Sequence, residues 1–273
     1  MFPGATADRD AAFYVVVGAP LDATTTFQPG TRFGPDRIRR FARTYDDYDH
    51  RTETFFSELG VHDAGDVHPW DDVRAYLDHL AAELRSVAFD DAVPLLVGGE
   101  HTVTYAGVEA VEPDTLVVCD AHLDLREAYD GNPWNHACVT RRCLDVVDRV
   151  VVVGARTGSP EEWERVADPD VEVVAPEDAR EWLDGLDDDA FAGESVYCSV
   201  DVDGLDPGFA PGTGTMEPFG LSPREVRDVV RTVAPHAEGF DVVEVNDRDD
   251  GQAAALAGKL LREFVRHRAA RSK

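Results

Sequence analysis

Lysine is nearly missing from this sequence of 273 residues, in which only Lys259 and Lys273 occur. Lysine and arginine together number 26 against 54 aspartates and glutamates, so the formal net charge is -28 at pH 7. A surface of this charge repels nucleic acids and anionic membranes, and we expect neither to be a partner. Concentrated salt screens the repulsion between acidic groups, so the composition indicates adaptation to a high-salt cytosol. An electrostatic funnel for a cationic substrate is the alternative, but it requires acidic charge at one mouth, whereas here the excess is spread along the chain.

Long apolar runs and paired cysteines are missing too. The apolar stretches have the length of β-strands, well short of the roughly 20 residues that a membrane-spanning helix needs. The amino terminus has neither the basic nor the apolar segment of a secretory leader, so we expect a cytoplasmic protein. The four cysteines show no C-x-x-C spacing, and Cys119 and Cys198 lie in predicted strands. We therefore expect buried free thiols.

Short apolar runs alternate with stretches in which apolar residues recur at helical spacing, and no linker rich in Gly, Pro or Ser divides the chain. This alternation predicts one domain over residues 1–273, an α/β fold whose mostly parallel central sheet is covered by helices on both faces. The predicted strands cover 13–17, 95–97, 116–119, 150–153, 171–174, 196–200 and 240–243. The predicted helices begin at 35–36 and cover about 70–87, 103–111, 136–147, 161–166, 176–183, 223–233 and 251–268.

Polar segments directly follow four of the predicted strands. They are Gly98-Gly99-Glu100-His101, Asp120-Ala121-His122-Leu123-Asp124, Asp201-Val202-Asp203 and Glu244. Open α/β sheets bind ligands outside the carboxyl ends of their strands, so segments that are distant in sequence can converge there. We expect these four to form one site.

Six side chains in these segments can bind metal: His101, Asp120, His122, Asp124, Asp201 and Asp203. Alternate positions of an extended stretch face the same way, so each segment can direct its ligands to one point. Four aspartates balance the charge of two divalent cations, and Asp120 and Asp201, each the first residue after its strand, are placed to bridge them. Sites rich in oxygen with few imidazoles suit Mn²⁺. The sequence therefore predicts two Mn²⁺ ions per chain.

Each segment alone has an ordinary interpretation. The pattern D-x-H-x-D can be a turn or capping cluster, and Asp-Val-Asp is common. Glu100 and His101 after two glycines can begin a helix, whose dipole favours Glu100. Their joint occurrence at strand ends favours a metal site.

Three motifs, in this order, resemble the signature segments of the ureohydrolase family, which includes arginase, agmatinase and formimidoylglutamase. They are Gly-Gly-Glu-His-Thr, Asp-Ala-His-Leu-Asp and Ser-Val-Asp-Val-Asp-Gly-Leu-Asp-Pro. Residues 30–35, 210–215 and 243–246 match as well, so the resemblance covers nearly the whole chain. The segment His-Ala-Cys-Val-Thr-Arg-Arg at 136–142 is most similar to archaeal agmatinases.

This resemblance implies a three-layer, arginase-like fold and a binuclear Mn²⁺ centre that hydrolyses a guanidinium. One ion would be held by His101, Asp120, Asp124 and Asp201, and the other by His122, Asp120, Asp201 and Asp203. Because metal lowers the pKa of bound water toward about 7, a bridging hydroxide would attack the guanidinium carbon. Asp124 can also accept a proton from the bridging water while remaining a ligand. The family usually forms trimers or hexamers, so a homo-oligomer is expected.

Two residues that are not ligands complete the expected site. Glu244 can pair in a bidentate manner with the planar guanidinium and orient its carbon, although a surface glutamate in a turn is the alternative. His136 resembles the family's active-site histidine and can shuttle a proton to the leaving amine, since imidazole titrates near neutrality. The alternative for His136 is a helix cap without a chemical role.

The chain departs from the family pattern at Asn135, Met216 and Asp247, which lie in loops that shape the pocket. The expected reaction is agmatine and water to putrescine and urea, because Glu127 and Asp130 could attract the second cationic group of agmatine. N1-aminopropylagmatine, guanidinobutyrate, formimidoylglutamate and arginine stay open as substrates. Formimidoylglutamate would need a cationic clamp, for which Arg126 is the nearby candidate.

Functions of another class are a non-catalytic binding protein on the same scaffold and a zinc deacetylase on the related fold. The first is expected to lose a metal ligand, and the second to keep one metal and to lack one aspartate of each pair. Neither loss occurs in this sequence.

Overall fold

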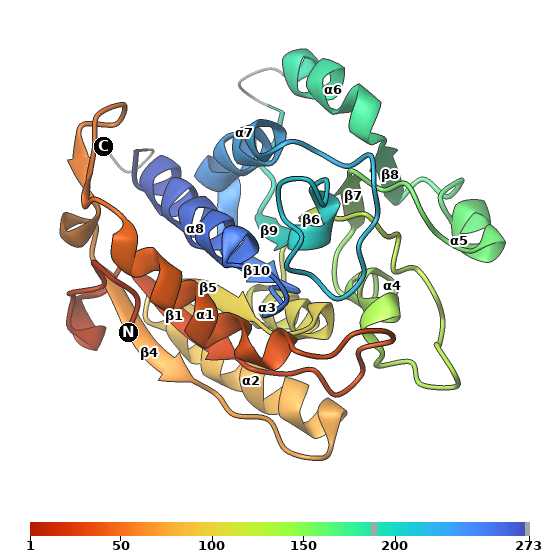
Figure 1. Ribbon diagram of the computed structural model, residues 1–273, viewed down its shortest axis with the longest axis horizontal. Helices are drawn as coiled ribbons and strands as arrows, with labels where there is room; N and C mark the ends of the chain where they lie inside the picture. The colour runs from red at the N-terminus through yellow and green to blue at the C-terminus, as the bar shows by residue number, and fades with distance from the viewer. Residues whose placement is uncertain (187–189, 271–273) are drawn as a thin grey trace.

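The computed structural model describes residues 1–186 and 190–270. In this part of the chain eight strands form one parallel sheet in the order β4-β1-β5-β10-β9-β6-β7-β8 (Figure 1). The strands are β1 (Tyr14–Ala19), β4 (Val61–Asp66), β5 (Val93–Gly98), β6 (Thr115–Cys119), β7 (Arg149–Val153), β8 (Val171–Val174), β9 (Val196–Asp201) and β10 (Ala237–Val243). A separate antiparallel pair is formed by β2 (Tyr48–Asp49) and β3 (Thr54–Phe55).

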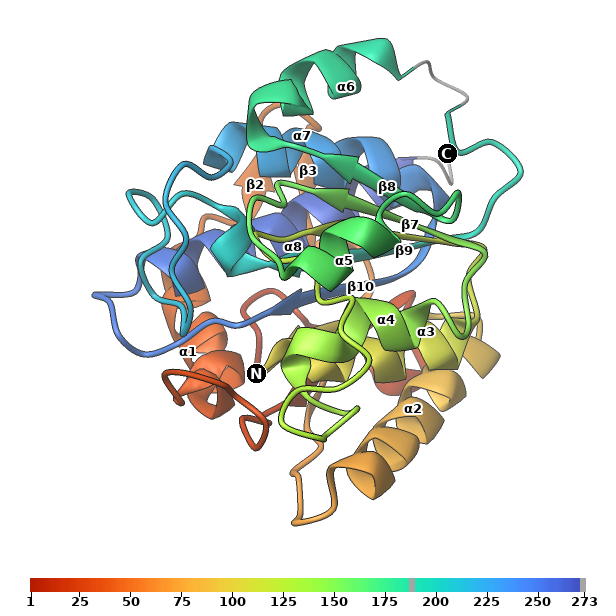
Figure 2. The ribbon, with the colours of Figure 1, turned by 90° about the vertical axis from the view of Figure 1, so that its right-hand side faces the viewer.

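Helices cover both faces of this sheet, so the predicted three-layer α/β fold is confirmed (Figure 2). One face carries α1 (Gly34–Phe41), α7 (Pro223–Val233) and α8 (Gln252–Ala270), and the other carries α2 (Val73–Phe89), α3 (Thr104–Val111) and α4 (Val139–Cys143). The short helices α5 (Pro160–Arg165) and α6 (Ala179–Gly185) precede and follow β8. Each face has its own apolar core. In the first, the rings of Phe240 on β10 and Phe264 on α8 stack with centroids 4.7 Å apart.

The local sequence determines where two of the helices begin. Ser222 and Glu225 form a capping box at the start of α7, and Ser159 and Glu162 form one at the start of α5. Proline follows each of these serines, where its missing N–H costs no hydrogen bond. These signals explain why the observed starts lie within one residue of the predicted ones.

The predicted strands all occur, but three strands were not predicted. Half of the β4 sequence, Val-His-Asp-Ala-Gly-Asp, is polar, which its partly buried position at an edge of the sheet allows. The strands β2 and β3 are two residues each. The helix predicted over 136–147 is also shorter, because a 3-10 turn over His136–Cys138 precedes α4.

Two predictions about environment can be compared with the structure. All four cysteines are free and buried, as expected. Among the described residues, no helix is both long and apolar enough to span a bilayer.

A buried ion pair connects α1 to the edge strand β4. Arg39 Nε and Nη2 donate to the two carboxylate oxygens of Asp63 at 2.9 and 2.8 Å. Replacing Arg39 with methionine would leave the buried Asp63 carboxylate with only the N-terminal ammonium of Met1, 3.7 Å away, as a nearby cation, so we expect a loss of about 3 kcal/mol in the free energy of unfolding. Urea denaturation at pH 7 measures this loss. As a control, Arg9 forms a 2.7 Å pair with Asp90 at the surface, and its replacement should cost less than about 1 kcal/mol. Equal losses for the two variants would contradict the expected effect of burial.

The same pair predicts a pH dependence. Burial alone would raise the pKa of Asp63, but hydrogen bonding and attraction from Arg39 outweigh it and hold the pKa below the usual 3.8. A depressed pKa stabilises the fold above the unfolded value, and this contribution is lost as pH falls through the folded value. The difference in urea midpoint between the wild type and Arg39→Met should therefore narrow as pH is lowered from 7 toward 3.

Candidate metal centre

The four polar segments predicted from the sequence follow four strands that are neighbours in the middle of the sheet. These strands lie in the order β5-β10-β9-β6 and are followed by His101, Glu244, Asp201 with Asp203, and Asp120 with His122 and Asp124, respectively. Because the strands are parallel, their carboxyl ends lie at one edge of the sheet. The predicted convergence therefore follows from the topology.

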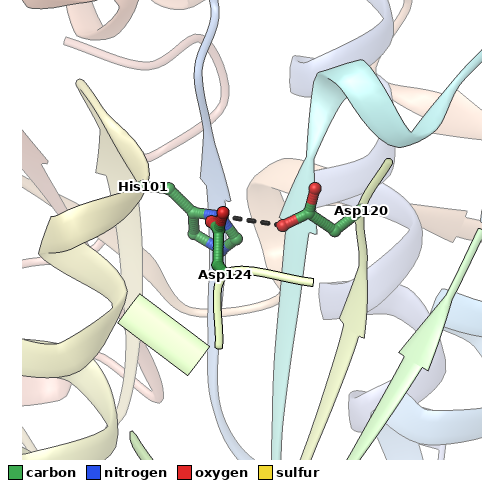
Figure 3. Close-up of side chains that lie close together, drawn as sticks. All are labelled: His101, Asp120 and Asp124. Carbon is green, nitrogen blue, oxygen red and sulfur yellow. Dashed lines mark ion pairs between the residues drawn. The ribbon is translucent and has the colours of Figure 1, made fainter. Parts of the chain in front are cut away.

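A first group is formed by His101, Asp120 and Asp124, all buried (Figure 3). His101 Nδ1 lies 3.0 Å from Asp120 Oδ2 and 3.2 Å from Asp124 Oδ2. Asp201 lies beside this group, with its Oδ2 3.3 Å from the same ring nitrogen. One ring nitrogen thus faces three carboxylate oxygens.

A second group is formed by Asp120, His122 and Asp203. His122 Nδ1 lies 3.1 Å from Asp203 Oδ2 and 3.5 Å from Asp120 Oδ1. Asp120 belongs to both groups, as expected of a bridging ligand. For Asp201, only the approach to His101 supports the predicted bridge.

Three of the carboxylates are fixed in a common way. Each accepts a backbone N–H with Oδ1: Asp120 from His122 at 2.7 Å, Asp201 from Asp203 at 2.8 Å, and Asp203 from Ala121 at 3.2 Å. In each case Oδ2 faces an imidazole of the cluster. The backbone therefore orients these side chains before any cation binds.

The donor set fits metal ions. His101 Nδ1 and Asp120 Oδ2 are buried and lack a hydrogen-bond partner within the described structure, although they lie 3.0 Å apart. Buried polar atoms are rarely left in this state unless a ligand is missing. Atoms that approach one another without hydrogen-bond geometry are directed at a common point, as ligands of one ion are.

The shifted pKa values of these side chains also indicate a metal site. Burial, followed by repulsion from Asp120, raises the pKa of Asp124 to about 6, and burial and Asp203 raise the pKa of Asp201 well above its usual range. Burial opposes protonation of His122, but Asp203 and Asp120 outweigh it and raise the pKa to about 12. Without metal, protons must supply the positive charge that this cluster requires. Divalent cations would replace them.

Glu244 is buried beside the metal groups, and one of its two carboxylate oxygens is already hydrogen-bonded. Its Oε1 accepts the backbone N–H of His101 at 2.9 Å and lies 3.0 Å from His136 Nδ1, whereas Oε2 is buried without a hydrogen-bond partner among the described residues. Only Oε2 is thus available to a ligand, so the expected bidentate pairing would require Oε1 to be shared.

Two residues of the site have strained backbones. Asp124 and Glu244 adopt φ angles of 50° and 61°, in the left-handed region that residues with side chains seldom occupy. Such strain persists where the surrounding structure imposes it, often at functional sites.

Both ring nitrogens of His136 contact the protein. The backbone N–H of Thr26 donates to Nε2 at 3.1 Å, and the Thr26 hydroxyl lies 2.9 Å from the same atom. An amide donor requires a free lone pair, so we assign the proton to Nδ1, which donates to Glu244. Burial opposes protonation of the ring, but Glu244 outweighs it and raises the pKa of His136 to about 9. The Thr26 amide acts against that shift and favours the neutral ring.

A hydrogen-bond network that was not predicted positions His136. Thr24 accepts the backbone N–H of His136 with its hydroxyl at 3.0 Å and donates its own N–H to the buried carboxylate of Glu100 at 2.7 Å. Asn135 donates its side-chain amide to the carbonyl of Thr24 at 2.8 Å. The signal in the sequence is the threonine run 24–26 in the loop after β1, since β1 is the neighbour of β5 in the sheet.

Several residues expected to contact the substrate are already engaged. Glu127 is exposed and pairs with Arg141 and Arg142 at 2.6 and 2.9 Å, so two arginines already offset the charge of its carboxylate. Arg126 pairs with Glu162 at 3.2 Å. These contacts weaken the expected roles of Glu127 and Arg126.

Comparison with known proteins agrees with this geometry. The model of the Arginase family matches residues 12–266. Agmatinase from Pyrococcus horikoshii is 37% identical over 270 residues, covering 94% of this chain and 92% of that protein. N(1)-aminopropylagmatine ureohydrolase from Thermococcus kodakarensis is 36% identical over 266 residues, covering 93% and 90%. The crystal structure of agmatine ureohydrolase of Thermoplasma volcanium matches with a TM-score of 0.90 and 35% identity, covering 98% of this chain and 93% of that one. The resemblance seen in the sequence is thus confirmed, and the chain belongs to the arginase family.

Proposed function

We propose that this protein hydrolyses agmatine to putrescine and urea with two Mn²⁺ ions per chain. The observation that carries this proposal is the pair of ligand groups that share Asp120. His101, Asp124 and Asp201 would complete the coordination of one ion, and His122, Asp203 and Asp201 that of the other. Bound ions would supply the Lewis acidity that lowers the pKa of water toward about 7.

The residues around this centre bind and orient the substrate. Glu244 Oε2 offers a buried acceptor to a guanidinium N–H, and a charge-assisted bond of this kind is strong in a site that excludes water. His136 and the backbone of His101 hold Glu244 in place through Oε1. A proton that passes through His136 would enter or leave at Nε2, beside the exposed Thr26.

The choice of agmatine rests on the relatives. Two of those reported above are named for agmatine, and the third for N1-aminopropylagmatine, which also carries a guanidinium. The aminopropyl derivative is therefore the second candidate. The engaged state of Arg126 speaks against formimidoylglutamate, which needs a cation for its carboxylates.

The decisive assay measures urea released from agmatine, N1-aminopropylagmatine, guanidinobutyrate and arginine, and formamide released from formimidoylglutamate. It is run in molar KCl with added Mn²⁺, because we also propose a high-salt cytosol as the working environment. We expect agmatine to give the highest kcat/KM. Release from none of these compounds would reject the function and favour a non-catalytic protein.

Removal of metal is a further test. Dialysis against EDTA should abolish urea release, because the carboxylates alone supply no Lewis acid, and Mn²⁺ should restore it. Metal analysis should give two ions per chain, whereas one ion per chain would favour a single-zinc, deacetylase-like protein. Sedimentation in the same buffer tests the proposed trimer or hexamer.

A further inference from the structure

Arg156, just after β7, uses its whole guanidinium on backbone carbonyl groups. Nη1 donates to the carbonyls of Gly154 and Gly204 at 2.9 and 3.2 Å, and Nε donates to that of Pro218 at 3.1 Å. Nη2 donates to the carbonyls of Asp203, Leu205 and Glu217 at 2.9, 3.4 and 2.6 Å. One side chain thus connects the end of β7 to both ends of the long loop that follows β9.

Arg156 contacts the segments of the second metal group both through its side chain and through its backbone. The guanidinium holds the backbone of Asp203, while the backbone N–H of Arg156 donates to the carbonyl of Ala121 at 2.9 Å. Ala121 lies between Asp120 and His122, and its own N–H donates to Asp203 Oδ1 at 3.2 Å. The guanidinium is therefore tied directly to Asp203, whereas Asp120 and His122 are connected to Arg156 through its backbone N–H, which a change of side chain keeps.

These segments approach one another closely at two glycines. A Cβ at Gly204 would lie 2.8 Å from the backbone nitrogen of Asp120, and a Cβ at Gly220 would lie 2.6 Å from Arg156 Nη2. The loop therefore sits directly against the Asp120 segment and against the guanidinium. In the first group, the backbone N–H of His101 donates to Glu244, and the carbonyl of Asp124 accepts the backbone N–H of Arg141, so these two ligands are held by other segments.

We propose that Arg156 is a positioning residue for the second metal group, and that its guanidinium keeps the backbone of Asp203, and with it the Asp203 carboxylate, at binding distance before a cation arrives. This inference rests on the two-metal part of the proposed function. Arginine suits the role because its planar group presents five N–H donors in fixed directions, whereas lysine offers one nitrogen. Arg156→Lys should therefore weaken binding at the second group and leave the first group nearly unchanged.

The test is a calorimetric titration of the metal-free protein with Mn²⁺ alone. We expect two ions per chain for the wild type. For Arg156→Lys we expect one ion of unchanged affinity and a second that binds roughly 10- to 100-fold more weakly, the range seen when residues that orient metal ligands are removed. Circular dichroism checks that the variant is folded. Arg156→Ala should weaken the binding of the second ion further.

Arg262 provides a matched control. Like Arg156 it is bound to backbone carbonyls, those of Asp46 and Pro3 at 2.8 Å each; it is buried and stacked on Phe56, but it contacts neither metal group in the described structure. Arg262→Lys should lower the melting temperature and keep both ions.

Two results would overturn the inference. One is that Arg156→Lys binds both ions with unchanged affinity. The other is that Arg156→Lys and Arg262→Lys both weaken the binding of both ions to the same extent. The titration needs no substrate. A wild type that binds two ions but releases no urea would therefore reject the proposed function without affecting the role of Arg156.

Discussion

Replacing Asp120 with alanine is expected to release both ions and to lower kcat/KM by more than about 10³-fold. Asp120 belongs to both ligand groups, with Oδ2 facing His101 and Oδ1 near His122. Its removal takes one ligand from each group and leaves the two imidazoles without the carboxylate between them, so both ions lose their shared ligand. Metal analysis after gel filtration, together with urea release from agmatine, measures both effects.

Asp203 supplies the control for this prediction, because it belongs to the second group alone. Asp203→Ala should retain one ion per chain, whereas Asp120→Ala should retain none. Asp201→Ala should resemble Asp120→Ala if Asp201 bridges as we propose. Two retained ions in Asp120→Ala would contradict the shared role of that residue.

Replacing Glu244 with glutamine should spare the metals and weaken turnover. The amide oxygen can still accept the N–H groups of His101 and His136 that Oε1 accepts now, so the metal groups should stay in place. The group that faces the substrate becomes an N–H donor instead of a carboxylate oxygen. Loss of one charge-assisted hydrogen bond is worth about 1.5–3 kcal/mol, so kcat/KM should fall by roughly 10- to 150-fold.

Asp241 offers the matched control on the same strand, β10. It is also fully buried, and burial raises its pKa, but it accepts a 2.6 Å hydrogen bond from Ser199 and belongs to neither metal group. Asparagine has the same shape and keeps this acceptor, so Asp241→Asn should change kcat/KM by less than about threefold. An unchanged kcat/KM in Glu244→Gln would remove Glu244 from substrate binding.

The site could be predicted where its chemistry is encoded locally. Asp120, Asp201 and Glu244 each come directly after an apolar run, and parallel strands bring such positions to one edge of a sheet. The ligands converge although these segments are not extended throughout, because Val202–Gly204 is a 3-10 turn and Asp124 has a left-handed backbone. Family resemblance added His136 and the division of ligands between two ions.

Other features depend on contacts that are distant in sequence. Thr26 reaches His136 across 110 residues, and Arg156 reaches Pro218 across 62. The threonine run 24–26 is visible in the sequence, but neither it nor a single arginine in a loop identifies its partner until the fold brings the two together. The pairing of Glu127 with two arginines could not be foreseen for the same reason.

The position of β10 has a consequence for synthesis of the chain. This strand is the last one made, yet it lies between β5 and β9, so until it is available the sheet consists of two halves, β4-β1-β5 and β9-β6-β7-β8. His101 follows the first half and all four aspartates follow strands of the second. The second metal group, Asp120, His122 and Asp203, comes from β6 and β9 and can form in the second half alone, whereas the first group needs His101 from the other half. A nascent chain on the ribosome is therefore expected to complete the first group only after residue 243 has emerged and β10 has joined the halves.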